Sequence, residues 1–305
     1  MNQLYIDGTW CPAADGGTRE IRCPADGVLV ATVPEGTRAD AEAAVAAARK
    51  AYDEGPWRTT SERERGQLLA RLADIIERDK KDFANAEALD TGKRLVEAEY
   101  DMDDVVASIR YYAGIGGTDA GRVVDTGNDG AISRIVYAPV GVCALITPWN
   151  YPLLQASWKV APCLLAGNTF VLKPSELTPS TAGLLMTALE EAGLPPGVAN
   201  LVLGAGAAVG APLTSDPRVD MISFTGGIVS GRRVMAEAAQ TVKRVALELG
   251  GKNPNVVFAD ADFDTAVDLA LTAVFLHSGQ VCSAGARLLV QDSIHDAFVA
   301  ALVKG

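Results

Sequence analysis

Residues 135–173 carry the pattern that decides the fold, and they read IVYAPVGVCALITPWNYPLLQASWKVAPCLLAGNTFVLK. The apolar runs 135–147 and 169–172 have the composition of buried strands, and the stretch 151–165 between them has that of a helix. Further runs of both kinds follow along the chain. We expect strands at 199–203, 220–224 and 254–258, and helices at 178–192, 206–214 and 229–240. This alternation predicts an α/β protein with a doubly wound parallel sheet, whose ligands bind outside the carboxyl ends of the strands.

The residues before this pattern predict strands and turns followed by helices. Thr37-Arg-Ala-Asp40 and Ser61-Glu-Arg-Glu64 have the capping-box pattern of helix starts. The predicted helices span 37–53, 61–91 and about 95–114. We interpret the acidic run from Glu97 to Asp104 on the third helix as a solvated face.

Two other segments stand outside the main pattern. Residues 115–133 are rich in Gly, Asp and Thr and lack apolar periodicity, which predicts an extended arm or an exposed hairpin. After Asp262 we expect a helix to about residue 277, a strand near 288–290 and a helix from 293. This last segment is interpreted as the beginning of a second α/β unit.

Composition and charge exclude several classes of protein. The 305 residues are 49% hydrophobic and carry a formal charge of -11, so a sizeable core is available and a basic surface for nucleic acid is not. We find neither a secretory signal nor an apolar run long enough to span a membrane. Five cysteines without CxxC spacing fit a reducing compartment, and we predict a cytoplasmic protein without a metal site or a membrane partner.

Two residues are candidates for covalent and acid–base chemistry. Cys282 lies among small residues in Ser278-Gly-Gln-Val-Cys-Ser-Ala-Gly285, where a loop could present its sulfur at a cleft. The alternative interpretation is an inert residue in a turn. Glu248 lies in an apolar strand that ends at Gly250-Gly251, where burial would raise its pKa and suit a general base. The alternative is an exposed acid at a strand edge.

Other candidates lie at predicted strand ends. Asn150, after the first strand, could donate a neutral hydrogen bond to an oxyanion, or it could be an ordinary turn residue. Lys173 and Glu176 could both address ribose hydroxyls, or they could form an exposed ion pair. Phe224-Thr-Gly-Gly-Ile-Val-Ser-Gly231 has the context of a phosphate-binding helix start, with Gly204-Ala-Gly206 as a competing candidate.

Taken together, the segments resemble the NAD(P)-dependent aldehyde dehydrogenase family. The resemblance runs from Tyr5-Ile-Asp-Gly-Thr-Trp10 to the last residues. It rests on the order of five motifs: Pro148-Trp-Asn150, Lys173-Pro-Ser-Glu176, Phe224-Thr-Gly-Gly227, Glu248-Leu-Gly-Gly251 and Gly279-Gln-Val-Cys282. Within the family the sequence is most similar to betaine aldehyde dehydrogenases and related ω-aminoaldehyde dehydrogenases.

The resemblance implies a catalytic role for three residues. Cys282 would attack the aldehyde and form a thiohemiacetal, and then a thioester after hydride transfer to NAD. Asn150 and the backbone N–H of Cys282 would hold the oxyanion, and Glu248 would activate the hydrolytic water. An acylating, CoA-dependent activity is disfavoured because Glu248 supplies the base for hydrolysis.

The same resemblance implies how the cofactor and substrate bind. Lys173 and Glu176 would bind the adenine ribose, and Glu176 favours NAD because its charge would repel a 2′-phosphate. The other residues expected to line the dinucleotide site are Thr147, Trp149, Gly226 and Gly227. Tyr151 and Trp158 match two aromatic positions that could bind a quaternary ammonium, or they could simply pack the helix. A third such position is Leu276, which weakens the assignment to betaine aldehyde.

The resemblance also implies the domain organisation. Residues 1–114 and 139–250 would form the Rossmann-like dinucleotide-binding domain, 115–138 an oligomerisation arm, and 251–305 part of a catalytic domain. Family members are usually longer and form homodimers or homotetramers. We therefore expect little or no dehydrogenase activity from the 305-residue chain alone. The alternative to an enzyme is a truncated, non-catalytic dinucleotide-binding or assembly fragment.

Overall fold

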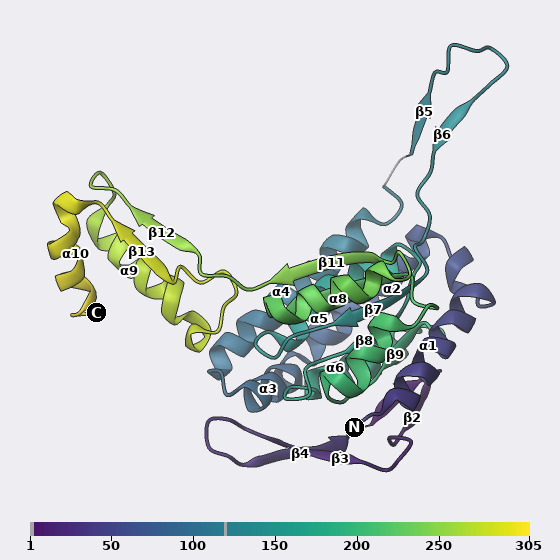
Figure 1. Ribbon diagram of the computed structural model, residues 1–305, viewed down its shortest axis with the longest axis horizontal. Coiled ribbons are helices and arrows are strands. Elements are labelled where there is room, and N and C mark those ends of the chain that lie inside the picture. Colours follow the sequence, from purple (N-terminus) through teal and green to yellow (C-terminus); the bar gives the residue numbers. More distant parts are fainter. Residues whose placement is uncertain (1–2, 119–120) are drawn as a thin grey trace. The chain divides into compact units, whose positions relative to one another are not determined.

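The computed structural model describes residues 3–118 and 121–305, which form two compact units. The first unit comprises Met1–Thr225 and Val229–Leu247, and the second comprises Gly226–Ile228 and Glu248–Gly305. Figure 1 shows the sheet and the helices of the first unit and the smaller α/β arrangement of the second.

The first unit is built on a seven-stranded sheet with the order β11-β10-β7-β8-β9-β1-β2. The strands are β1 (Leu4–Ile6), β2 (Thr9–Cys11), β7 (Val142–Ile146), β8 (Thr169–Lys173), β9 (Ala199–Leu201), β10 (Met221–Gly226) and β11 (Arg244–Leu249). Strands β10, β7, β8 and β9 are mutually parallel, whereas β1 pairs antiparallel with β9 and β2. The parallel-rich α/β sheet is the fold class that the alternating pattern predicts.

The strand order identifies where this sheet should bind ligands. From β7 the chain proceeds outward through β8 and β9, then returns to place β10 on the other side of β7. This order matches the first five strands of the dinucleotide-binding arrangement, in which a crevice opens where the order reverses. The reversal lies at the carboxyl end of β7, immediately before Thr147.

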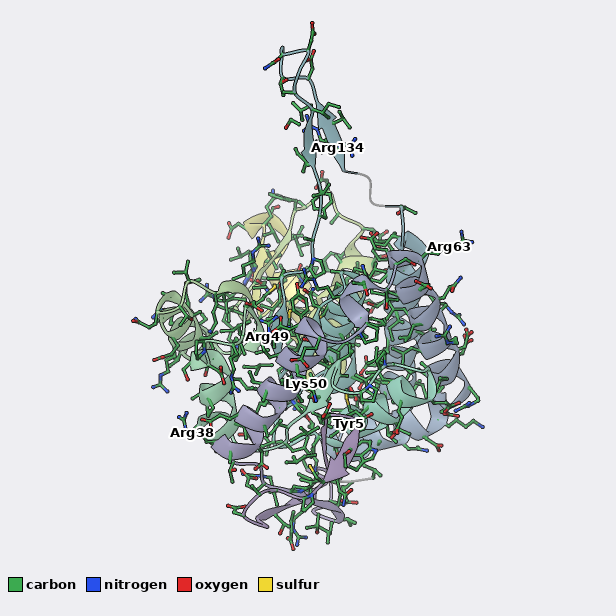
Figure 2. All side chains as sticks on the ribbon, turned by 90° about the vertical axis from the view of Figure 1, so that its right-hand side faces the viewer. Tyr5, Arg38, Arg49, Lys50, Arg63 and Arg134 are labelled. Carbon is green, nitrogen blue, oxygen red and sulfur yellow. The ribbon has the colours of Figure 1, made fainter. Side chains whose placement is uncertain are left out.

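Helices and β-hairpins form the rest of the first unit as far as the structure describes it. The helices are α1 (Arg38–Asp53), η1 (Trp57–Thr59), α2 (Glu62–Arg78), α3 (Lys80–Thr91), α4 (Leu95–Ile115), α5 (Pro152–Leu165), α6 (Ser180–Glu191), η2 (Gly206–Gly210), α7 (Ala211–Ser215) and α8 (Ile228–Ala239). Besides the β1–β2 pair, β3 (Thr18–Arg22) pairs with β4 (Leu29–Pro34), and β5 (Arg122–Val124) pairs with β6 (Ser133–Ile135), both antiparallel. The β5–β6 hairpin, marked by Arg134 in Figure 2, exposes apolar side chains such as Val123.

The predicted helix over 61–91 is wrong as a single element, because the chain forms α2 and α3 with a break at Asp79. The backbone N–H of Asp79 donates to the carbonyl of Ile75 in the last turn of α2. The carbonyl of Asp79 accepts from the N–H groups of Asp82 and Phe83 in the first turn of α3. Aspartate favours helix ends over helix interiors. The capping box at Ser61 and Glu64 is present as predicted.

The predicted strand over 135–147 is also interrupted, between Ile135 of β6 and Val142 of β7. Gly141 has φ +132, and a Cβ there would lie 1.9 Å from Asp220 Oδ2. That carboxylate accepts from Val142 N at 2.7 Å and from Arg49 Nη1 at 2.8 Å (Arg49 is labelled in Figure 2). The close approach of Asp220 therefore fixes where β7 starts.

The second unit is a small α/β arrangement with its own core. It contains β12 (Pro254–Val257), α9 (Phe263–Phe275), η3 (Leu276–Gly279), β13 (Arg287–Val290), η4 (Asp292–Ile294) and α10 (His295–Leu302). Strands β12 and β13 are parallel. The core is formed by Val257, Val267, Ala270 and Phe298, with the Phe263 and Phe298 rings edge-to-face at 5.5 Å. Across residues 3–118 and 121–305, none of the helices has the length and apolarity that a membrane crossing requires.

Candidate active site

The turn after β7 places several predicted site residues at the point where the strand order reverses. Thr147 is buried, and its N–H donates to the carbonyl of Lys173 at the end of the neighbouring strand, at 3.1 Å. Its hydroxyl oxygen has no hydrogen-bond partner among the residues that the structure describes. Trp149 is 45% exposed, and Asn150 directly precedes Tyr151, the N-cap of α5. The turn thus places one indole, one amide and one buried hydroxyl at the carboxyl end of β7.

Lys173 and Glu176 form an ion pair at the end of β8. Lys173 Nζ lies 2.9 Å from Glu176 Oε2, and the lysine side chain is 4% exposed against 33% for the glutamate. Burial acts to raise the pKa of Glu176, but the charge and hydrogen bond of Lys173 outweigh it and leave that pKa lowered. The pair is thus a partly buried ionised cluster at a strand end, and not a solvated surface pair.

A buried lysine that sequence patterns did not identify lies against Tyr151. Lys93 Nζ is 4.9 Å from the centre of the Tyr151 ring, 2.5 Å from Asp101 Oδ2 and 3.2 Å from Glu87 Oε1. The side chains of Lys93, Glu87 and Asp101 are 2%, 0% and 9% exposed. We call these three residues the buried ion cluster. Its ammonium occupies one face of the tyrosine that follows Asn150.

The buried ion cluster corrects the interpretation of residues 97–104 as a solvated face. Glu97 and Asp101 are buried, whereas Asp103 and Asp104 are exposed. The helical periodicity of this segment contains a signal for the burial of Glu97 and Asp101 that the interpretation from sequence missed. Asp101 lies four residues after Glu97, and both positions adjoin the buried stripe of Ala98, Met102 and Val105. An acidic residue next to an apolar stripe lies at its border, where burial depends on the packing partner.

Glu87 gives the fold a specific pH dependence. Burial, opposed by the charge of Lys93, raises the pKa of Glu87 to about 7. Because the folded state binds this proton more tightly than the unfolded state, its contribution is complete below about pH 4.3 and is lost as pH rises through about 7. The free energy of unfolding of the wild type should therefore fall across this window relative to that of Glu87→Gln, by about 1.4 kcal/mol per unit of pKa shift.

Urea unfolding of both chains at several pH values measures this difference. Glu77→Gln, at an exposed carboxylate paired with Arg110, is the control and should leave the slope unchanged. Parallel pH profiles for the wild type and Glu87→Gln would contradict the assignment.

The second unit holds the thiol and the carboxylate that the sequence singled out. Cys282 lies in the loop between η3 and β13, and its thiol is exposed and forms no disulfide. The backbone carbonyl of Cys282 accepts from Asn253 Nδ2 at 3.2 Å. Upstream, His277 and Ser278 both have φ +55, in the left-handed region that is uncommon for residues other than glycine. The backbone therefore turns sharply before Cys282, and the Cys282 sulfur is exposed to solvent.

Glu248 and the glycines Gly226 and Gly227 also belong to the second unit. Glu248 is exposed, near the end of β11, so the burial considered for it from sequence is absent in this chain. Gly250 N donates to the Gly226 carbonyl at 3.4 Å. A Cβ at Gly227 would meet nothing within 4 Å, so this position has room for a side chain. The predicted site residues are thus divided between the two units. Those in the first unit are Thr147, Trp149, Asn150, Tyr151, Trp158, Lys173 and Glu176.

Trp158 lies on α5, seven residues after Tyr151, and is 49% exposed. Tyr151 is half-buried and packs against the main core of the first unit. These environments leave the Trp158 ring accessible, while the face of Tyr151 toward Lys93 is covered.

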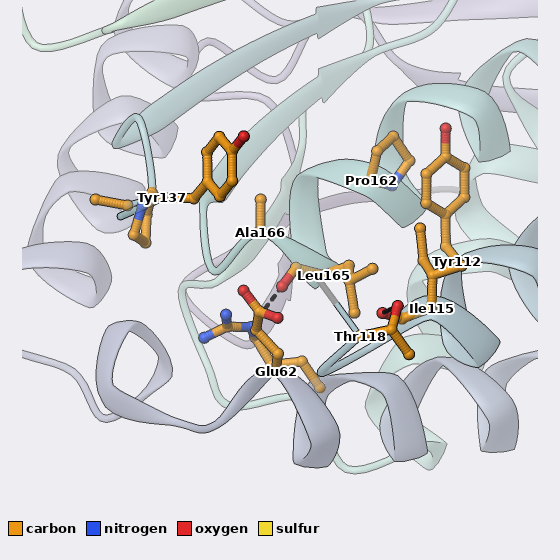
Figure 3. A pocket seen from close by; sticks show the side chains of 11 residues that line it. Glu62, Tyr112, Ile115, Thr118, Tyr137, Pro162, Leu165 and Ala166 are labelled. Carbon is orange, nitrogen blue, oxygen red and sulfur yellow. Dashed lines mark hydrogen bonds between the residues drawn. The ribbon is translucent and has the colours of Figure 1, made fainter. Parts of the chain in front are cut away.

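A cavity of about 530 Å³ lies elsewhere in the first unit, between α2, α4 and α5 (Figure 3). Glu62, Tyr112, Tyr137 and Leu165 are among the residues that line it. Arg65 forms part of its wall and donates from Nε to the Leu165 carbonyl at 2.7 Å. None of the predicted site residues lines this cavity, so it is separate from them. Within the described ranges, no group of three or more His, Cys, Asp or Glu side chains could hold a metal ion.

Comparison with known proteins matches residues 10–305 to the family described as "Aldehyde dehydrogenase family". Betaine aldehyde dehydrogenase of Bacillus subtilis is 54% identical over 301 residues, covering 99% of this chain and 61% of that protein. An aldehyde dehydrogenase of Emericella nidulans is 43% identical, over 97% of this chain and 60% of that protein. A crystal structure of betaine aldehyde dehydrogenase from Staphylococcus aureus in complex with NAD+ superposes with a TM-score of 0.98 at 48% identity, covering 100% of this chain and 60% of that one. The chain thus spans about three fifths of the length of these relatives.

Proposed function

The chain belongs to the aldehyde dehydrogenase family, and on that premise we propose that the protein containing it oxidises an aldehyde to the carboxylic acid with NAD. The observation that carries this proposal is the free, exposed thiol of Cys282 in the loop whose motif resembles the family's nucleophile. A thiol can act as a nucleophile only where a substrate can reach it.

The proposed chemistry uses three residues. The Cys282 sulfur would lose its proton to water and bond to the aldehyde carbon, while the C=O π electrons move onto oxygen; the side-chain amide of Asn150 and the N–H of Cys282 would donate to this oxyanion. When bound, NAD supplies the acceptor for the hydride that leaves this carbon, and the acyl group then remains on sulfur as a thioester. Glu248 accepts a proton from the water that attacks the thioester, which releases the acid and frees the thiol. Removing one oxyanion donor typically costs about 10²–10³ in rate.

The carboxyl ends of β7 and β8 fit the adenosine half of NAD. Lys173 and the ionised Glu176 offer a donor and an acceptor to the two ribose hydroxyls. Glu176 would repel a 2′-phosphate and so favours NAD over NADP. The buried, unpartnered hydroxyl of Thr147 is a polar group that a ligand at this edge could satisfy. Trp149, Gly226 and Gly227 would line the rest of the dinucleotide site.

The substrate that we propose is betaine aldehyde or a related aminoaldehyde, because Bacillus subtilis and Staphylococcus aureus relatives bear that name. Trp158 would attract its cationic group through its ring, and Tyr151 through the ring face opposite Lys93. Residues 1–114 and 139–250 would form the dinucleotide-binding domain and 251–305 part of the catalytic domain. Residues 115–138 would act as an oligomerisation arm in a homodimer or homotetramer.

The test joins residues 1–305 to the remaining two fifths of the Bacillus subtilis relative, which the match does not cover. We expect this completed protein to form NADH from NAD in the presence of betaine aldehyde, followed at 340 nm. A neutral aldehyde of similar size should react with a higher KM. A completed protein that folds and binds NAD but forms no NADH with either aldehyde would refute the proposed activity.

A further inference from the structure

The segment after the β3–β4 hairpin is anchored to the loop after β9. Gly36 N donates to the Leu203 carbonyl at 2.9 Å, and Glu35 Oε1 accepts from Ala205 N at 2.9 Å. A Cβ at Gly36 would lie 2.3 Å from the Leu203 oxygen, so the two backbones are in direct contact. Residues about 170 positions apart in sequence are thereby joined at the end of a central strand.

Arg19 fixes the carboxylate that makes this connection. Its Nη2 donates to Glu35 Oε1 at 2.9 Å, and its Nε donates to the other carboxylate oxygen. The hydrogen bond from Arg19 lowers the pKa of Glu35 against the opposing effect of burial, with a smaller contribution from the charge of Lys173. The charge of Arg19 likewise contributes to the lowered pKa of Glu176. The Arg19–Glu35 pair and the Lys173–Glu176 pair are therefore electrostatic neighbours.

The turn that Glu35 holds has little conformational tolerance. Gly204 has φ +138, and a Cβ there would lie 2.9 Å from the Gly36 carbonyl oxygen. Ala205 is the N-cap of η2, and its N–H donates the hydrogen bond to Glu35 Oε1. Val202 N donates to the Leu172 carbonyl, which places this turn next to the end of β8 and thus next to Lys173. The turn and the ion pair lie on adjacent strands at the same sheet edge.

We propose that Glu35 is a positioning residue for the adenosine end of the dinucleotide site: through the Ala205 amide it fixes the Gly204–Gly206 turn beside Lys173 and Glu176, and Arg19 holds Glu35 in place. This inference rests on the dinucleotide site in the proposed function. It adds the β3–β4 hairpin and Glu35 directly after it, which include none of the residues expected to touch the cofactor, to the elements that shape that site.

The experiment measures ADP-ribose binding to the 305-residue chain by calorimetry. Glu35→Ala removes the acceptor of the Ala205 amide and should weaken binding about tenfold, the scale of one charge-assisted hydrogen bond. Glu35→Gln keeps an oxygen that can accept from both Ala205 and Arg19, so it should restore most of the affinity. Glu20→Gln is the matched control, since Glu20 pairs with Arg22 on the same hairpin with both side chains more than half exposed.

The outcomes separate this inference from the site on which it depends. Wild-type affinity in Glu35→Ala, or an equal loss in Glu20→Gln, would refute the positioning role. If Glu35→Ala does not fold, Glu35→Gln and Arg19→Met decide, and the inference requires Arg19→Met to bind more weakly than Glu35→Gln. No ADP-ribose binding by the unsubstituted chain would refute the dinucleotide site itself, and the positioning role with it.

Discussion

Replacing Cys282 with alanine should abolish aldehyde-dependent NADH formation in the completed protein, with a loss of about 10⁴-fold or more. Removal of the nucleophile has effects of at least this size in other covalent catalysts. Within residues 1–305 no other cysteine offers a replacement sulfur. Cys23, Cys143 and Cys163 are buried, and burial raises the pKa of Cys163 well above its usual value. Cys11 is only partly buried, but it lies in β2, the outermost strand of the sheet, which β8, β9 and β1 separate from β7.

Cys11→Ala is therefore the matched control, and it should retain full activity. Glu248→Gln separates the two halves of the reaction. This variant should form about one NADH per active site in a rapid burst and then turn over slowly, because the thioester forms but its hydrolysis lacks a base. Steady turnover in Cys282→Ala would eliminate the covalent mechanism. A Glu248→Gln variant without a burst would instead place Glu248 in the first half of the reaction.

The elements that sequence predicted best are those with a strong local signal. Strands β8 and β10 nearly coincide with the predicted apolar runs, β7 occupies the second half of the predicted run 135–147, and the turn at Asn150 follows directly from the end of that run. Parallel packing then brings Thr147 and Lys173 to one edge without further information. The prediction of a ligand-binding edge therefore needed only the order of strands and helices.

The features that sequence missed depend on contacts between distant residues. Glu35 looks like an ordinary acid before a helix, and only the fold brings it to Ala205. Asp101 belongs to a run of acids that a solvated helix would also contain, and its burial follows from the approach of Lys93. Local patterns show that a helix has an acidic border. They do not show which residue from another element covers that border.

Replacing Lys93 with methionine should destabilise the first unit by about 3–5 kcal/mol. Methionine keeps most of the volume but removes the ammonium that pairs with Glu87 Oε1 and Asp101 Oδ2. Breaking a buried ion pair on one side costs this much because an unpaired buried charge remains. Urea unfolding of the 305-residue chain, followed by circular dichroism, measures the loss.

Lys80→Met is the matched control, because Lys80 also connects α3 to α4, through Asp103 at 2.7 Å. Its side chain is 32% exposed and that of Asp103 is 60% exposed, so this pair should contribute no more than about 1 kcal/mol. Equal losses in the two variants would show that the buried ion cluster contributes no more to the free energy of unfolding than a surface ion pair does.

The pH dependence of the Lys93→Met loss tests its cause. Lys93 lowers the pKa of Glu87, which even so stands at about 7 in the wild type, so its removal should raise that pKa further. The variant can then protonate Glu87 at pH values where the wild type still ionises it, so the penalty should shrink as pH falls from the alkaline side toward about 7. A loss of packing around the methionine would be independent of pH. A constant difference between wild type and Lys93→Met at pH values above about 7 would therefore assign the destabilisation to packing and not to the unpaired charge of Glu87.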